Sequence, residues 1–209
     1  IKKWMMYLIN DQKIYIKECG KQEKNMPKAL ILAAGRGVRL GELTKNQPKP
    51  TIKVGNKTIL RRIIENLHLN KIYEIIINCH YLPMMIVEET GFEALFFYEE
   101  QLLGHEATIQ HLRKWLEGDD FFVINGDTIS NVNFLDMIQQ HQKGTIGILL
   151  DSWRAAGVWL YPKEFFESTD IVIKPYRPSG LVWFDVGTPE RLEAARKHYE
   201  DEKIVNRVS

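Results

Sequence analysis

The chain has 209 residues, 44% of them hydrophobic, and a formal net charge of +1 at pH 7. This length and apolar content are enough for one domain with a substantial core, and the balanced charge argues against nucleic-acid or acidic-membrane partners. Two cysteines, Cys19 and Cys79, are too few for a metal cluster or a disulfide framework. No apolar run approaches the roughly 20 residues that cross a membrane. The sequence therefore predicts a cytoplasmic protein with no nucleic-acid and no membrane partner.

Residues 1–26 differ in pattern from the rest of the chain. The stretch YLINDQKIYIKECG, at 7–20, predicts two short strands joined at Asn10-Asp11 and followed by a polar linker. This segment is either an added hairpin or the remnant of an upstream domain, and its residues indicate no chemistry. We therefore expect the main domain to occupy residues 27–209.

Short apolar runs alternate with helical patterns along that domain. Runs that are apolar on both faces are typical of parallel strands covered by helices on both sides. Helical stripes occur at 58–69 and 106–116, and a further helix is expected to begin with Thr188 as its N-cap and Pro189 as its first residue. The pattern predicts an α/β fold of three layers with a mostly parallel central sheet. The expected strands are KALILAA (28–34), YEIIINC (73–79), LFFY (95–98), FFVIN (121–125), TIGILL (145–150), AGVWLY (156–161) and LVWF (181–184).

The loop after the first strand has the composition of a phosphate-binding turn. Gly35 and Gly37 leave its amides accessible, and Arg36 and Arg39 add charges that suit forked contacts to phosphate. Lys49 stands between two prolines, which restrict the backbone around it. The glycine spacing fits neither the dinucleotide fingerprint nor a P-loop. An ordinary strand-to-helix turn is the alternative interpretation of the glycines taken alone.

Two aspartates follow apolar strands. Asp127 comes just past FFVIN and Asp185 just past LVWF, so both are expected at the sheet edge where α/β proteins bind ligands. Two carboxylates at that edge suit Mg²⁺, which takes substrate phosphates as further ligands. Taken singly, each aspartate also fits an ordinary turn.

Several segments together resemble the sugar-1-phosphate nucleotidyltransferases, also called nucleotide-sugar pyrophosphorylases. LAAGRGVRL followed by PKPTIKVGNKTIL is similar to that family's signature, and FFVINGDTI, AAGVWLYPKEFF and WFDVGTPERLEAA resemble its later motifs in the same order. The resemblance covers about residues 28–200. It implies a Rossmann-like nucleotidyltransferase fold, Mg²⁺ as cofactor, and transfer of a nucleotidyl group from a nucleoside triphosphate to a sugar 1-phosphate. The segment IIINCHYLPMMI favours GTP or UTP, and a homo-oligomer is compatible with the resemblance.

The resemblance also implies roles for individual residues. Arg39 and Lys49 are expected to stabilise charge on the leaving pyrophosphate, because the sugar phosphate can attack without a nucleophile from the protein. Asp127 and Asp185 are expected to hold the metal. The remaining assignments are nucleotide contacts by Leu32, Ala33, Ala34, Gly35, Arg36, Gly37, Gly104 and Asp127, and sugar-phosphate contacts by Asn78, Gly157 and Lys174.

The second half of the chain departs from the family pattern. LLGHEAT keeps Gly104 of the family's LGTA segment but changes its neighbours, which leaves the nucleobase open. Only DSWR separates TIGILL from AAGVWLY, where the family has some tens of residues that include a Glu-Lys-Pro. Lys174, in VIKP, resembles that lysine but stands just before the last strand. Either the sugar-binding half is short, or mobile loops are missing from the sequence. Cytidylyl transfer to a phosphorylated alcohol such as phosphocholine, and a non-catalytic nucleotide-binding domain, are the alternative functions.

Overall fold

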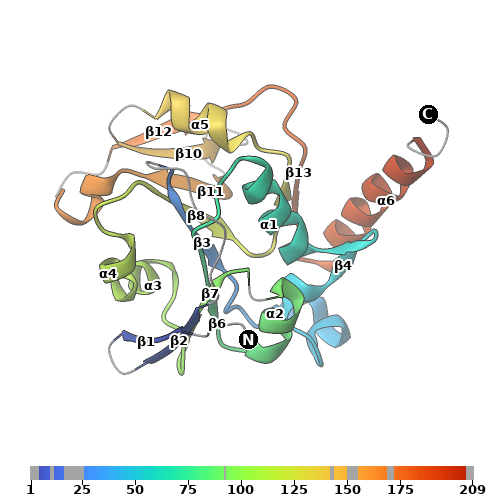
Figure 1. The fold of residues 1–209 in the computed structure, drawn as a ribbon. Helices are drawn as coiled ribbons and strands as arrows, with labels where there is room; N and C mark the ends of the chain where they lie inside the picture. Colours follow the sequence, from blue (N-terminus) through green and yellow to red (C-terminus); the bar gives the residue numbers. More distant parts are fainter. Residues whose placement is uncertain are drawn as a thin grey trace.

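The computed structural model describes residues 5–9, 12–16, 26–91, 93–141, 144–149, 155–168 and 172–205. Near the N-terminus, β1 (Met5–Ile9) and β2 (Gln12–Ile16) form the predicted antiparallel hairpin. The expected turn at Asn10-Asp11 lies outside the described residues. The hairpin packs next to the edge of the main domain, with β2 beside β7 (Leu95–Tyr98) (Figure 1).

One sheet of seven strands forms the centre of the domain, in the order β12-β10-β11-β8-β3-β6-β7. The pairs β8–β3, β3–β6, β6–β7 and β10–β12 are parallel, whereas β11 runs antiparallel to both of its neighbours. The predicted mostly parallel sheet is therefore confirmed. Besides β7, its strands are β3 (Lys28–Leu32), β6 (Ile75–Cys79), β8 (Phe121–Asn125), β10 (Thr145–Leu149), β11 (Ala155–Tyr161) and β12 (Ile173–Tyr176).

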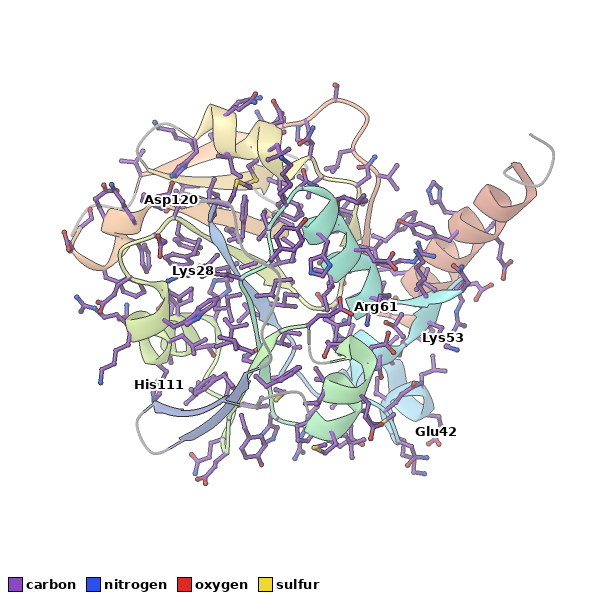
Figure 2. The ribbon with its side chains drawn as sticks, viewed as in Figure 1. Lys28, Glu42, Lys53, Arg61, His111 and Asp120 are labelled. Carbon is purple, nitrogen blue, oxygen red and sulfur yellow. The ribbon has the colours of Figure 1, made fainter. Side chains whose placement is uncertain are left out.

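Helices cover both faces of this sheet because its central strands are apolar on both, and side chains fill the space on either side (Figure 2). In β3, Ala29 and Ile31 belong to the core shared with α1, α2, α5 and α6, while Leu30 belongs to the core shared with α3 and α4. The predicted three-layer arrangement is thus confirmed. The helices are α1 (Ile59–Leu69), α2 (Pro83–Thr90), α3 (His105–His111), α4 (Arg113–Leu116), α5 (Phe134–Gln140) and α6 (Pro189–Val205).

Two helices begin after threonine caps, and one of these is Thr188, the N-cap that the sequence predicts. The Thr58 side chain accepts a hydrogen bond from the backbone N–H of Arg61 at 3.0 Å. Thr188 does the same for Arg191 at 3.4 Å, and Pro189 is the first residue of α6. Within the described part of the chain, no helix combines the length and apolar character needed to cross a membrane.

Several predicted elements have different bounds in the structure. The strand predicted at 73–79 is Ile75–Cys79, and the one predicted at 156–161 is Ala155–Tyr161. The stripe at 106–116 is divided into α3 and α4 at Leu112, whose backbone (φ −88°, ψ 6°) is not helical while its side chain stays fully buried. The first strand ends at Leu32 rather than at residue 34. Beyond Leu32 the chain leaves the strand, and the amide of Ala33 donates to the side-chain Oδ1 of Asn78 at 2.6 Å.

The strand predicted at 181–184 does not join the central sheet. It is β13 (Trp183–Asp185), and it pairs antiparallel with β9 (Thr128–Ser130) in a small separate sheet. Asp185 is therefore the last residue of a strand beside the main sheet, rather than a residue at the end of a central strand. The other short elements are η1 (Val38–Thr44), η2 (Lys49–Thr51), β4 (Lys53–Val54), β5 (Lys57–Thr58) and η3 (Lys163–Phe166).

Candidate functional site

A cavity of about 230 Å³ lies at the carboxyl ends of β3 and β8. It forms where the glycine loop after β3 meets η2, the turn between β8 and β9, and the segment after β13. None of its lining residues is aromatic. They are Leu32, Ala33, Gly35, Gly37, Val38, Arg39, Lys49, Pro50, Gly126, Asp127 and Gly187.

The glycine loop packs tightly at one glycine and is open at another. Gly37 has a left-handed backbone (φ +66°), and a Cβ there would lie 3.0 Å from the side chains of both Lys49 and Thr44. The hydroxyl of Thr44 donates to the carbonyl of Gly37 at 3.0 Å, which fixes the turn. A Cβ at Gly35, in contrast, would have no atom within 4 Å. The loop therefore holds Gly37 against Lys49 and leaves the cavity side of Gly35 free for a ligand.

Lys49 is the buried cation of the cavity. Pro48 and Pro50 restrict the backbone on either side of it, and η2 begins at Lys49 itself. Its side chain is only 7% exposed, and its Nζ lies 2.6 Å from Oδ2 of Asp127. A buried ammonium requires such a partner, because an unpaired charge away from water is strongly unfavourable. The structure thus brings together two of the residues that the sequence analysis singled out.

Asp127 lies in the turn between β8 and β9. The backbone N–H of Gly126 donates to the Leu32 carbonyl at 2.8 Å, and a Cβ on Gly126 would lie 2.7 Å from that oxygen. Only glycine lets the turn approach β3 so closely. On the other side, the amide of Val186 donates to the carbonyl of Asp127 at 2.9 Å. The pairing of β9 with β13 therefore brings Asp185 to the same turn.

Asp185 has one engaged and one unengaged carboxylate oxygen. Oδ2 accepts from Nη1 of Arg191 at 2.5 Å, whereas Oδ1 is buried and has no hydrogen-bond partner among the described residues. A Cβ on Gly187 would lie 2.7 Å from this Oδ1 and 3.2 Å from Nη2 of Arg39. Gly187 therefore lets a carboxylate and a guanidinium flank the same part of the cavity wall.

The two aspartates fit a divalent cation as part of its ligand set. Asp127 and Asp185 would supply two carboxylate oxygens, and the unpartnered Oδ1 of Asp185 is the kind of ligand that Mg²⁺ prefers. No group of three or more His, Cys, Asp or Glu side chains that could hold a metal is present in the described ranges. The remaining ligands would therefore come from phosphate and water.

A buried hydrogen-bond network supports the cavity wall from behind. The amide of Ala33 is bound by Asn78, whose Nδ2 donates to Oε1 of Glu99 at 2.8 Å. Glu99 is 1% exposed and also accepts from the Thr108 hydroxyl at 2.5 Å and, through Oε2, from the Leu103 amide at 3.2 Å. The network thereby connects the glycine loop to the segment before α3 and to α3 itself.

Most of the predicted nucleotide-binding residues lie together. Ala34 is buried behind the glycine loop, Arg36 is exposed on it, and Gly104 precedes α3; none of the three lines the cavity. Their contacts with a nucleotide stay predictions. The predicted residues that do line the cavity are Leu32, Ala33, Gly35, Gly37, Arg39, Lys49 and Asp127.

The predicted sugar-phosphate residues lie outside the cavity lining. Both ends of the Asn78 amide are engaged in the buried network. Gly157 has φ +72°, and a Cβ there would lie 2.6 Å from Nδ2 of Asn125 in β8. Lys174 is in β12, opposite Ile146 of β10. The sugar contacts of these residues stay predictions.

The sequence analysis missed several residues of the site. The cavity is also lined by Val38, Pro50, Gly126 and Gly187. The two glycines each lie within two residues of an aspartate that the sequence analysis named, and this proximity could have identified them. Glu99 offered no signal, because a buried acid and a solvated acid look alike in an acidic stretch.

The family model described as "Nucleotidyl transferase" matches residues 28–153, which include the glycine loop, Lys49 and Asp127. The chain belongs to the nucleotidyl transferase family. Similar proteins include "Mannose-1-phosphate guanylyltransferase catalytic subunit beta" of Dictyostelium discoideum, 30% identical over 161 residues that cover 71% of this chain and 45% of the relative. "Mannose-1-phosphate guanyltransferase beta-B" of Xenopus laevis is 29% identical over 195 residues, covering 84% and 54%. The chain thus spans about half the length of these curated relatives.

Solved structures share the fold of this nucleotidyl transferase. HddC from Yersinia pseudotuberculosis, complexed with GMP-PN, has a TM-score of 0.70 at 20% identity and covers 83% of this chain and 100% of its own. UDP-glucose pyrophosphorylase from Acinetobacter baumanii has a TM-score of 0.67 at 13% identity, covering 88% and 100%. The predicted Rossmann-like nucleotidyltransferase fold is therefore confirmed.

Gly35→Ala is expected to weaken ligand binding without lowering the stability of the fold. The melting temperature should stay the same or rise slightly, because the added methyl meets no atom and the backbone is not left-handed. Affinity for a nucleoside triphosphate analogue should fall about 10-fold, because the methyl hinders approach to the loop amides. Scanning fluorimetry and isothermal titration calorimetry measure the two effects. Wild-type affinity in the variant would contradict binding at this cavity.

Glu99→Ala should lower the free energy of unfolding by about 2–4 kcal/mol, because it leaves buried donors on Asn78, Thr108 and Leu103 without their acceptor. Urea denaturation measures the loss. The neighbouring Glu100 is exposed, so Glu100→Ala serves as the control and should leave stability unchanged. Equal losses in the two variants would contradict the structural role of the network.

Proposed function

We propose that this nucleotidyl transferase moves a nucleotidyl group from a nucleoside triphosphate, with GTP or UTP favoured, to a sugar 1-phosphate, giving a nucleotide-sugar and pyrophosphate. The observation that carries the proposal is the buried Lys49–Asp127 pair in a cavity that also contains the glycine loop and Arg39. The guanylyltransferase names of its relatives support GTP. Mg²⁺ dependence and a cytoplasmic location are part of the same proposal.

The reaction needs no nucleophile from the protein. A sugar 1-phosphate carries about −1.5 to −2 charges at neutral pH, and one of its oxygens forms a bond to the α-phosphorus as the bond to pyrophosphate breaks. The protein must bring the polyanions together and stabilise charge on the leaving group. Arg39 and Lys49, which both line the cavity, would do this work, and the burial of Lys49 would strengthen its interaction with phosphate oxygens.

Asp127 and Asp185 are the residues that would hold the metal. Mg²⁺ held by Asp127 and Asp185 would neutralise charge on the phosphates when bound. Arg191 engages Oδ2 of Asp185 and leaves Oδ1 for that ligand role. Lys49 would exchange its contact with Asp127 for contacts with the substrate phosphates.

A panel of substrates tests the proposal. The chain is incubated with Mg²⁺, each nucleoside triphosphate, and either a sugar 1-phosphate or phosphocholine, and pyrophosphate release is measured. We expect the highest rate with GTP or UTP and a sugar 1-phosphate. Release confined to CTP with phosphocholine would favour the cytidylyl alternative. Nucleotide binding without release for any acceptor would favour a non-catalytic domain.

Lys49→Gln should lower kcat/KM in the productive combination by about 10²–10³-fold, because it removes one preorganised charge from the leaving group. Lys45→Gln is the matched control from the same segment. The Lys45 side chain is 66% exposed and pairs with the exposed Glu42 at 3.5 Å, so its loss should not change activity. Retained activity in Lys49→Gln would exclude the role of this lysine.

Asp185→Asn should weaken Mn²⁺ binding, measured by electron paramagnetic resonance with a bound triphosphate analogue, by about 10-fold. The melting temperature should change little, because the Asp185–Arg191 pair is partly exposed. Asp119→Asn, whose side chain is 50% exposed and pairs with Lys28, is the control and should bind Mn²⁺ normally. Unchanged Mn²⁺ affinity in Asp185→Asn would place the metal elsewhere.

A further inference from the structure

The end of β3 is held differently on its two sides. Leu32 is opposite Asn125 of β8 on one side and Asn78 of β6 on the other (Figure 1). On the β8 side the next hydrogen bond still joins two backbones, because the amide of Gly126 donates to the Leu32 carbonyl at 2.8 Å. On the β6 side a side chain takes over, and the amide of Ala33 donates to Oδ1 of Asn78 at 2.6 Å. The side chain of Asn78 therefore stands where a strand backbone would otherwise continue.

Both of these hydrogen bonds belong to one peptide group, the one that joins Leu32 to Ala33. In a trans peptide the C=O and the N–H point in opposite directions, so the group accepts on one side and donates on the other. The Asn78 amide repeats this pattern, because its Nδ2 donates to Oε1 of Glu99 at 2.8 Å. A single hydrogen-bond line thus runs from Gly126 through two amide groups to a carboxylate.

The Asn78 amide fits this line in one orientation. The N–H of Ala33 needs an acceptor, whereas the carboxylate of Glu99 needs a donor. Among side chains of the same size, aspartate would set a second carboxylate against Glu99, and leucine would pair with neither group. Ala33, Asn78 and Glu99 are each at most 4% exposed, so bulk water would not replace a lost contact.

The far end of the hydrogen-bond line is a fixed charge. A carboxylate is a stronger acceptor than a neutral group, and amides aligned in one sense polarise one another. Glu99 is held in turn by the Thr108 hydroxyl and the Leu103 amide. The near end of the line is Gly126, and the next residue in the chain is Asp127. The line therefore connects a buried anchor to the turn that carries Asp127.

We propose that Asn78 is a positioning residue for nucleotidyl transfer. It connects Glu99 to the peptide group that holds the Gly126 amide, and it thereby sets where the Asp127 carboxylate lies beside Lys49. This inference rests on the proposed function, in which Asp127 holds the metal. It gives Asn78 a role different from the sugar-phosphate contact that the family resemblance implies.

Asn78→Ala interrupts the hydrogen-bond line, and Cys79→Ala is the matched control. Cys79 is the next residue of β6, is 2% exposed, and has its side chain on the opposite face of the sheet. The affinity for Mn²⁺ is measured by electron paramagnetic resonance with a non-hydrolysable triphosphate analogue and no sugar phosphate. We expect Asn78→Ala to weaken it about 5-fold, because groups behind a metal ligand affect metal affinity through the ligand's orientation. Cys79→Ala should bind Mn²⁺ as the wild type does.

Two further measurements separate positioning from other roles of Asn78. In steady-state kinetics, Asn78→Ala should lower kcat and leave the KM for the sugar 1-phosphate unchanged, whereas a direct sugar contact would raise that KM. In native-state hydrogen exchange, the Gly126 amide should exchange faster in Asn78→Ala than the loss of global stability explains. Cys79→Ala gives the exchange expected from destabilisation alone.

If Asn78→Ala does not fold, Glu99→Gln provides the test, because it keeps the shape of the side chain and removes the charge that ends the line. We expect it to weaken Mn²⁺ binding about 2-fold to 3-fold. Wild-type Mn²⁺ affinity in the tested variant, or a raised KM for the sugar phosphate as the only change, would overturn the positioning role and leave the proposed function standing. If the wild type binds no Mn²⁺ with any triphosphate analogue, the proposed function and this inference are overturned together.

Discussion

The ion pair between Lys49 and Asp127 joins residues 78 positions apart in the chain, and the rest of the site is built around it. Because the lysine side chain is almost entirely buried, it is stable there only with its charge paired. Gly37 is a glycine because its backbone packs directly on that side chain. The same pair holds the turn after β8 in place. In that turn, the carbonyl of Asp127 accepts the hydrogen bond from the amide of Val186. One buried charge thereby determines where three separate segments meet.

Three acids lie at or behind the cavity, namely Asp127, Asp185 and Glu99. They differ in the kind of group that contacts their carboxylates. Asp127 is paired with Lys49, and Asp185 is paired with Arg191. Glu99 is bound instead by an amide side chain, a hydroxyl and a backbone N–H, none of which carries a charge. Its two oxygens accept three hydrogen bonds inside the protein. Glu99 therefore serves as a fixed support, whereas each of the two aspartates is paired with a charged side chain.

The fold was largely predictable because its signals are local. The strands at 95–98 and 121–125 have their predicted bounds, and Thr188 caps α6 as predicted. The pairing of β13 with β9 was not predictable in the same way, because LVWF is as apolar as a central strand and its partner is only three residues long. The register of Asp185 depends on that nonlocal pairing.

The candidate site was predictable where the type and spacing of its residues are unusual. It was not predictable where an ordinary residue has unusual surroundings. Arg39, Lys49 and Asp127 stood out by type and spacing, and the structure gathers them in one cavity. Glu99 looked like any other acid of its acidic stretch. Its role comes from its burial and from the three donors around it, which no local pattern reveals.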